Sequence, residues 1–113
     1  MITSASLGWL ETLLPNSTID ERRFRPNLLI KTPGTGLIEH DWISKKLLIG
    51  QQLEIEITSL TERCIMVGFP QSELDIDFQI FKTIDKKSKH YFGIYAKVIR
   101  SGVICVGDKV FGT

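Results

Sequence analysis

The segment from Gln52 to Leu60 constrains the fold of this chain more than any other part of its sequence. Three aliphatic residues there alternate with three polar ones: Leu53, Ile55 and Ile57 against Glu54, Glu56 and Thr58. Successive side chains of a strand leave on opposite faces, so this alternation predicts a strand with one packed face and one solvated face.

Other segments predict a sheet around this strand. Residues 92–99 repeat the alternation, and short apolar runs at 28–30, 103–106 and 110–111 lie beside Gly, Pro or Asp turns. Two short helices are predicted, one capped by Ser4 or Ser6 and one from Asp77 to about Lys86. The sequence therefore predicts a mostly β fold whose sheet is curled or closed to protect its edges.

Length and charge limit the class of protein. The 113 residues predict a single domain spanning residues 1–113. The formal net charge of +1 is too small to attract nucleic acid or a membrane surface electrostatically, so neither is expected as a partner. No apolar run is long enough to span a bilayer, and the N-terminus lacks a signal-peptide pattern, so we expect a cytoplasmic protein. Its two cysteines are then expected to be free thiols, although the sequence leaves open whether they can pair.

Cys64 is the first candidate for chemistry. It follows the alternating strand and stands next to Arg63. An adjacent cation favours the thiolate, which is the form that attacks electrophiles or ligates a soft metal. The alternative is a small buried apolar residue, which is the commoner role of an isolated cysteine. Cys105 has no such cation and lies in an apolar run, so we expect it to pack in the core.

Arg25 and Asn27 form a second candidate. The two residues flank Pro26, and in an extended backbone their side chains would leave the same face. This would place a cation and an amide side by side at the mouth of a strand. The alternative is a solvated arginine and a turn asparagine.

Four motifs occur in an order that resembles a known family. They are Arg23-Phe24-Arg25-Pro26-Asn27, Thr61-Glu62-Arg63-Cys64-Ile65-Met66, Phe92-Gly93-Ile94-Tyr95-Ala96 and the segment from Gly102 to Val110. This succession is similar to the MOSC domain, the module at the C-terminus of molybdenum cofactor sulfurases. The domain also occurs in stand-alone bacterial proteins and in amidoxime-reducing molybdenum enzymes. The opening Thr3-Ser4-Ala5-Ser6-Leu7 resembles the segment where such domains enter their first helix.

The resemblance implies a β-barrel-like fold with two or three short peripheral helices. It implies that Cys64 is the functional cysteine, as a thiolate ligand to molybdenum in the reductase branch or as a sulfur carrier. Arg25, Asn27 and Arg63 match positions that hold the pterin and phosphate of molybdenum cofactor (molybdopterin), and Thr3 and Ser4 match the hydroxyl-bearing entry segment. The family is also associated with pyridoxal phosphate binding.

The chain departs from the reductase branch in two ways. Nothing corresponds to that branch's separate N-terminal β-rich domain, and the opening strand is short or missing. Three hypotheses follow: a module that binds molybdenum cofactor or exchanges its sulfur with a donor or acceptor protein, an oxidoreductase served by a redox partner, and a structural module with a decayed site. An open sheet edge also predicts a homodimer.

Overall fold

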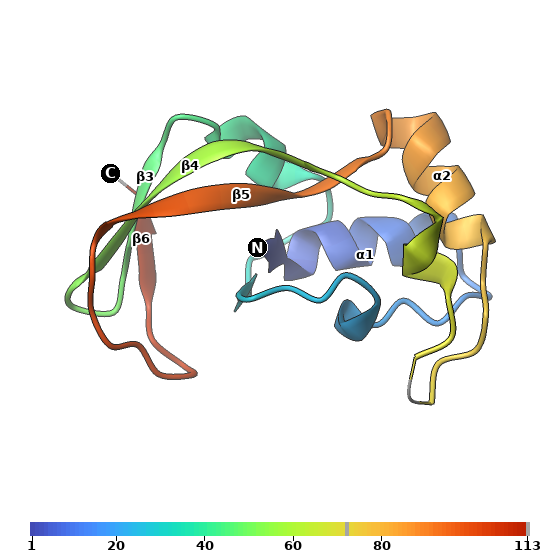
Figure 1. Cartoon of the computed structure of the whole chain (residues 1–113), viewed down its shortest axis with the longest axis horizontal. Coiled ribbons are helices and arrows are strands. Elements are labelled where there is room, and N and C mark those ends of the chain that lie inside the picture. The colour runs from blue at the N-terminus through green and yellow to red at the C-terminus, as the bar shows by residue number, and fades with distance from the viewer. Residues whose placement is uncertain (72, 113) are drawn as a thin grey trace.

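Two long antiparallel strands connect the two ends of the molecule. In the computed structural model, which describes residues 1–71 and 73–112, β4 (Leu53–Glu62) pairs along its length with β5 (Tyr91–Arg100). Figure 1 shows the helices gathered at one end of these strands and the shorter strands at the other. The strand predicted from the alternation at 52–60 is confirmed, and Ile55 and Ile57 are the residues that it buries.

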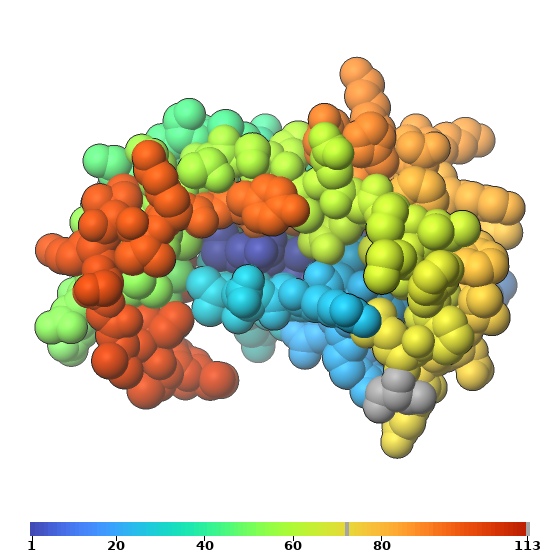
Figure 2. Space-filling view, in the orientation of Figure 1, coloured from blue at the N-terminus to red at the C-terminus, as the bar shows by residue number. Residues whose placement is uncertain are grey.

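The main sheet has four strands and stays open. Its order is β5-β4-β3-β6, with β3 (Lys46–Ile49) and β6 (Val110–Gly112) both joined in antiparallel register. Its two edge strands, β5 and β6, do not pair with each other. Figure 2 shows the C-terminal hairpin standing apart from the segment that carries β2. The expectation of a closed, barrel-like sheet is therefore wrong for the described residues.

A second, parallel sheet of two short strands lies beside the main one. β1 (Ile2–Thr3) pairs with β2 (Leu29–Ile30), and Met1, just before β1, exchanges two backbone hydrogen bonds with Ile94 of β5. The N-terminus is thereby fixed against the long strand.

Two α-helices close one end of the fold. α1 (Ser4–Leu13) is capped by the Thr3 hydroxyl, which accepts from the Ser6 N–H, so the cap lies one residue before the predicted Ser4. α2 (Gln79–Ser88) begins where the Asp77 carboxylate accepts from the Gln79 N–H, close to the prediction. Three 3-10 turns complete the described elements: η1 (Glu21–Arg23), η2 (Ile38–Trp42) and η3 (Ile65–Gly68). The fold is mixed α/β rather than mostly β.

The core is divided between the two ends. One cluster, around Leu10, Ile80, Ile84 and Phe92, packs the helices against the start of β5. The other, around Ile49, Ile55, Ile57 and Ile94, lies on the sheet. No described helix is long and apolar enough to cross a membrane.

The C-terminal part corrects two sequence predictions. Residues 103–106 form no strand, and Cys105 is exposed on a loop instead of packed in the core. The apolar run Val103-Ile104-Cys105-Val106 is typical of a strand, but only Ile104 packs against the core: Val103 is 87% exposed and Val106 is fully exposed. Tertiary context decides β propensity here.

Glu39 is a fully buried carboxylate that joins η2 to the start of α1. It accepts hydrogen bonds from the Thr3 N–H (3.0 Å), from the Thr3 hydroxyl (3.2 Å) and from the Ser6 hydroxyl. It forms no ion pair within the described part of the chain. The unpaired N–H groups at a helix N-terminus favour a negative charge. The start of α1 therefore stabilises the buried Glu39 carboxylate, as a cation would do elsewhere.

Candidate functional site

Cys64 lies where β4 ends and the η3 turn begins. Its thiol is exposed and borders a cavity of about 260 Å³. The alternative of a small buried apolar residue is therefore wrong for Cys64, and its role as a thiolate stays a prediction. The cavity is lined by Arg23, Phe24, Arg25, Glu62, Arg63, Cys64, Met66, Val67, Phe69, Pro70 and Gln71.

The η3 turn is held in place by a close backbone approach at Gly68. The Asp77 N–H donates to the Gly68 carbonyl at 2.8 Å. A Cβ at Gly68 would lie 2.2 Å from the Asp77 carbonyl oxygen, so only glycine fits there. This contact fixes the segment that follows Cys64 against the start of α2.

Arg63 combines a structural role with a free charge. Its Nε donates to the Phe92 carbonyl at 2.8 Å, its Nη1 donates to the Phe24 carbonyl at 3.0 Å, and its guanidinium lies 5.3 Å from the centre of the Phe24 ring. Burial lowers the pKa of Arg63, while the negative charges that Tyr95 and Cys64 can carry raise it. No carboxylate of the described residues forms an ion pair with it. Both partners are neutral carbonyls, so its positive charge remains available to an anion.

Gly93 makes room for this arginine. Its φ is +87°, and a Cβ there would lie 3.0 Å from Arg63 Nη2 and 2.8 Å from the Ile2 side chain. The glycine of the Phe-Gly-Ile motif at 92–94 therefore leaves room for the Arg63 guanidinium. A larger residue there would displace the arginine or β1.

Arg23 is a structural arginine. It is 4% exposed, and its guanidinium donates to the carbonyls of Thr18 (3.0 Å), Asp75 (2.8 Å) and, at 3.5 Å, Val67. These bonds tie three separate loops together behind the cavity. Its guanidinium is therefore committed to the fold.

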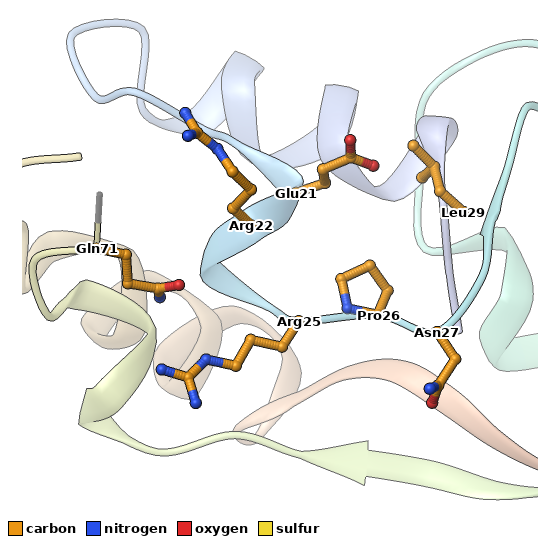
Figure 3. Close-up of a pocket in the computed structure, with 7 residues that line it drawn as sticks. All are labelled: Glu21, Arg22, Arg25, Pro26, Asn27, Leu29 and Gln71. Carbon is orange, nitrogen blue, oxygen red and sulfur yellow. The ribbon is translucent and has the colours of Figure 1, made fainter. Parts of the chain in front are cut away.

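Arg25 and Asn27 border a second, adjoining cavity of about 510 Å³. Figure 3 shows both side chains leaving the backbone on the side that faces β4, with the Pro26 ring on the other side. Both are exposed, and neither makes a hydrogen bond or ion pair with any described residue. Arg25 and Gln71 line both cavities, so the structure brings Arg25, Asn27, Arg63 and Cys64 to one continuous surface.

The backbone at Arg25 differs from the extended one expected. Its φ of +48° lies in the left-handed region, which a non-glycine residue seldom adopts and which is further disfavoured before a proline. Backbone strain of this kind is found at ligand sites, where the surroundings hold a side chain in a required direction.

This strain gives a testable prediction. Arg25→Gly should be about 1 kcal/mol more stable to urea than Arg25→Ala, because alanine keeps the left-handed penalty and glycine does not. Both variants remove the same guanidinium. Equal free energies of unfolding for the two would show that the left-handed conformation at this position carries no strain.

The remaining charged side chains near the cavities differ in whether they already have a partner of opposite charge. Arg22 is paired with Asp20 through two side-chain hydrogen bonds of 3.0 Å, which lower the pKa of Asp20. Glu21 lines the larger cavity and Glu62 the smaller, each opposing part of the positive charge. Arg23, Arg25 and Arg63 carry no carboxylate partner in the described residues, and of these three Arg23 is buried and bonded to three carbonyls.

Thr3 and Ser4 lie elsewhere. Thr3 is fully buried, and its hydroxyl is committed to Glu39 and Ser6; the Ser4 hydroxyl donates to the Thr32 carbonyl and accepts from the Thr32 N–H. Neither residue lines either cavity. Their contribution to ligand binding stays a prediction from the resemblance.

Sequence reasoning missed Gln71, Met66 and Phe69 as cavity residues. Met66 is 53% exposed and Phe69 41%, beside the thiol. Met66 and Phe69 are apolar, so their residue types indicate a core position. Gln71 lies beside Arg25 only because the chain turns back after Pro70. The one signal available for Met66 was its position two residues after Cys64.

The described residues contain no group of three His, Cys, Asp or Glu side chains able to hold a metal ion. Any metal at Cys64 would therefore have to bring most of its ligands with it.

Comparison with known proteins agrees with the four motifs. A family model described as "MOSC domain" matches residues 1–111. A search of curated proteins found no match. The matched range covers every residue of the two cavities.

Proposed function

Because the chain belongs to the MOSC domain family, we propose that it is a small module that binds molybdenum cofactor or carries its sulfur through Cys64. One observation carries this proposal: an exposed thiol shares a cavity with three arginines that have no carboxylate partner among the described residues, namely Arg25, Arg63 and the buried Arg23. Thiol and cations together suit an anionic ligand that contains sulfur and a soft metal.

The residues fit the cofactor by chemistry. Its phosphate is a ligand for the guanidinium forks of Arg25 and Arg63. Asn27 can both donate and accept, as the edge of a pterin requires. The cavity of about 510 Å³ falls within the range of small-molecule sites, and the cavity of about 260 Å³ adjoins it. The dithiolene of the cofactor would also bring the metal ligands that this chain does not supply.

Cys64 would perform the chemistry of the chain itself. When bound, the cofactor supplies a molybdenum centre for redox chemistry, and the Cys64 thiolate would be a ligand to it. In sulfur transfer, the same thiolate would bond to the terminal sulfur of a donor protein's persulfide. The donor's S–S bond would break, and the donor cysteine would leave as a thiolate. Arg63, next in the chain, would hold the negative charge of the sulfur in either role.

The exposed apolar residues beside the thiol favour a second candidate, an oxidoreductase with a separate redox partner. Ile65, Met66 and Phe69 are 46%, 53% and 41% exposed, and they offer an apolar rim to a substrate or partner protein. In this alternative Cys64 has the same position, and the difference lies in whether the metal stays bound.

Metal and pterin content after expression in a cofactor-competent host tests the proposal. Cys64→Ser should lower the retained molybdenum, or the persulfide seen as one added sulfur by mass spectrometry, at least about tenfold. Cys105→Ser is the matched control, because it removes an exposed thiol that lines neither cavity. Stoichiometric molybdenum supports the oxidoreductase, and substoichiometric or sulfur-only loading supports the carrier. Loading that is absent, or equal in the two variants, leaves a structural module.

A further inference from the structure

Glu62 is a carboxylate of the candidate site that the fold does not use. It is exposed, lines the cavity of about 260 Å³, and its side chain forms no hydrogen bond or ion pair with any described residue. Arg63 is next to it in the chain, yet the Arg63 guanidinium donates to the carbonyls of Phe92 and Phe24 instead. An unpaired carboxylate repels a simple anion, so such a ligand alone does not explain its place in this site.

The backbone places this carboxylate on the same side as the thiol. β4 ends at Glu62, whose register partner on β5 is Tyr91, and Cys64 still has extended backbone angles, with φ −134° and ψ −179°. Side chains alternate along an extended chain, so those of Glu62 and Cys64 leave on the same side, with Cα atoms about 7 Å apart. Both residues line the same cavity. A ligand that contacts the thiol can therefore reach the carboxylate as well.

The larger cavity faces the same strand end. Figure 3 shows the Arg25 and Asn27 side chains directed toward β4, the strand that ends at Glu62. The other carboxylate among the described residues of these cavities, that of Glu21, lies on the opposite side of the loop. Glu62 is therefore the carboxylate placed to share a ligand with Arg25, Asn27 and Cys64.

We propose that Glu62 selects the pterin of the cofactor, by accepting hydrogen bonds from its 2-amino group and from the neighbouring ring N–H. This inference rests on the proposed function. The two groups are parallel donors at one edge of the ring, and a carboxylate supplies two acceptor oxygens, as it does for a guanidinium. Inorganic phosphate brings its own negative charge to the carboxylate, so Glu62 disfavours it and acts as a specificity-determining residue.

Pterin and lumazine test this contact, because lumazine has an oxo group in place of the 2-amino group. Fluorescence titration of the full chain should show that pterin binds at least about tenfold more tightly, since the oxo group would face the carboxylate without a proton between them. Glu62→Gln should reduce this preference to less than about threefold, because the amide has only one accepting oxygen. Glu11→Gln is the matched control: it changes an exposed carboxylate that lines neither cavity and should keep the wild-type preference.

Calorimetric titration with inorganic phosphate checks that the variant keeps the site. Phosphate should bind Glu62→Gln as tightly as the wild type or more tightly, since the substitution removes a negative charge from the cavity. Loss of phosphate binding together with pterin binding would show that Glu62 has a structural role, and it would overturn the proposal.

Failure of this inference is distinguishable from failure of the proposed function. A wild type that binds pterin and lumazine equally, or binds neither, overturns the role of Glu62, and so does a Glu62→Gln variant that keeps the preference. If the wild-type chain still retains molybdenum and pterin after expression, the proposed function stands and only the role of Glu62 is wrong. If it retains neither cofactor nor persulfide, both are wrong.

Discussion

Replacing Arg63 with alanine is expected to lower the free energy of unfolding by about 3 kcal/mol, or the melting temperature by roughly 12 °C. The guanidinium donates to the carbonyls of Phe92 and Phe24 and lies over the Phe24 ring, so it joins β5 to the loop that carries Arg25. Charge-assisted hydrogen bonds contribute about 1.5–3 kcal/mol each, and alanine leaves both carbonyls without this partner. Urea denaturation followed by circular dichroism measures the loss.

Arg25→Ala is the control for this variant. It removes a guanidinium from the same surface, but the Arg25 guanidinium has no partner among the described residues. The free energy of unfolding of this variant should therefore stay within about 0.5 kcal/mol of the wild-type value. Both variants should retain less cofactor. Equal stability losses in the two would contradict the structural role of Arg63.

Replacing Glu39 with alanine is expected to be the most destabilising single change, by about 4 kcal/mol. The substitution removes three hydrogen bonds to a buried carboxylate and leaves buried donors on Thr3 and Ser6 unsatisfied. The consequence is loss of the contact between η2 and the N-terminus of α1. Thermal unfolding gives the total, and hydrogen exchange at the amides of Thr3 and Ser6 localises it.

Two variants bracket this result. Glu39→Gln keeps the shape and one accepting oxygen, so about half of the loss is expected. Asp41→Ala removes an exposed carboxylate two residues away and should change stability by less than about 0.5 kcal/mol. If Glu39→Ala unfolds like Asp41→Ala, the buried network does not stabilise the fold.

The site shows how far sequence reasoning reached. Cys64 was named from its position after a strand with a clear period of two and beside Arg63, and the structure shows that its thiol is exposed. The neighbours Arg25 and Arg63 were named from residue type and motif, and the structure brings them to adjoining cavities. The left-handed backbone of Arg25 and the commitment of Arg23 to three carbonyls were not accessible in this way, because both depend on loops that meet only in the folded chain.

The sequence by itself determined the local elements. The alternation at 53–58 specified β4, Asp77 marked the start of α2, and Pro15 to Ser17 marked the end of α1, since each depends on side-chain periodicity or on hydrogen bonds a few residues apart. Only the tertiary structure decided that the sheet stays open, that Cys105 is exposed and that the Thr3 hydroxyl donates to Glu39. Those outcomes depend on which distant segment covers a strand or a helix end, and no pattern within one segment contains that information.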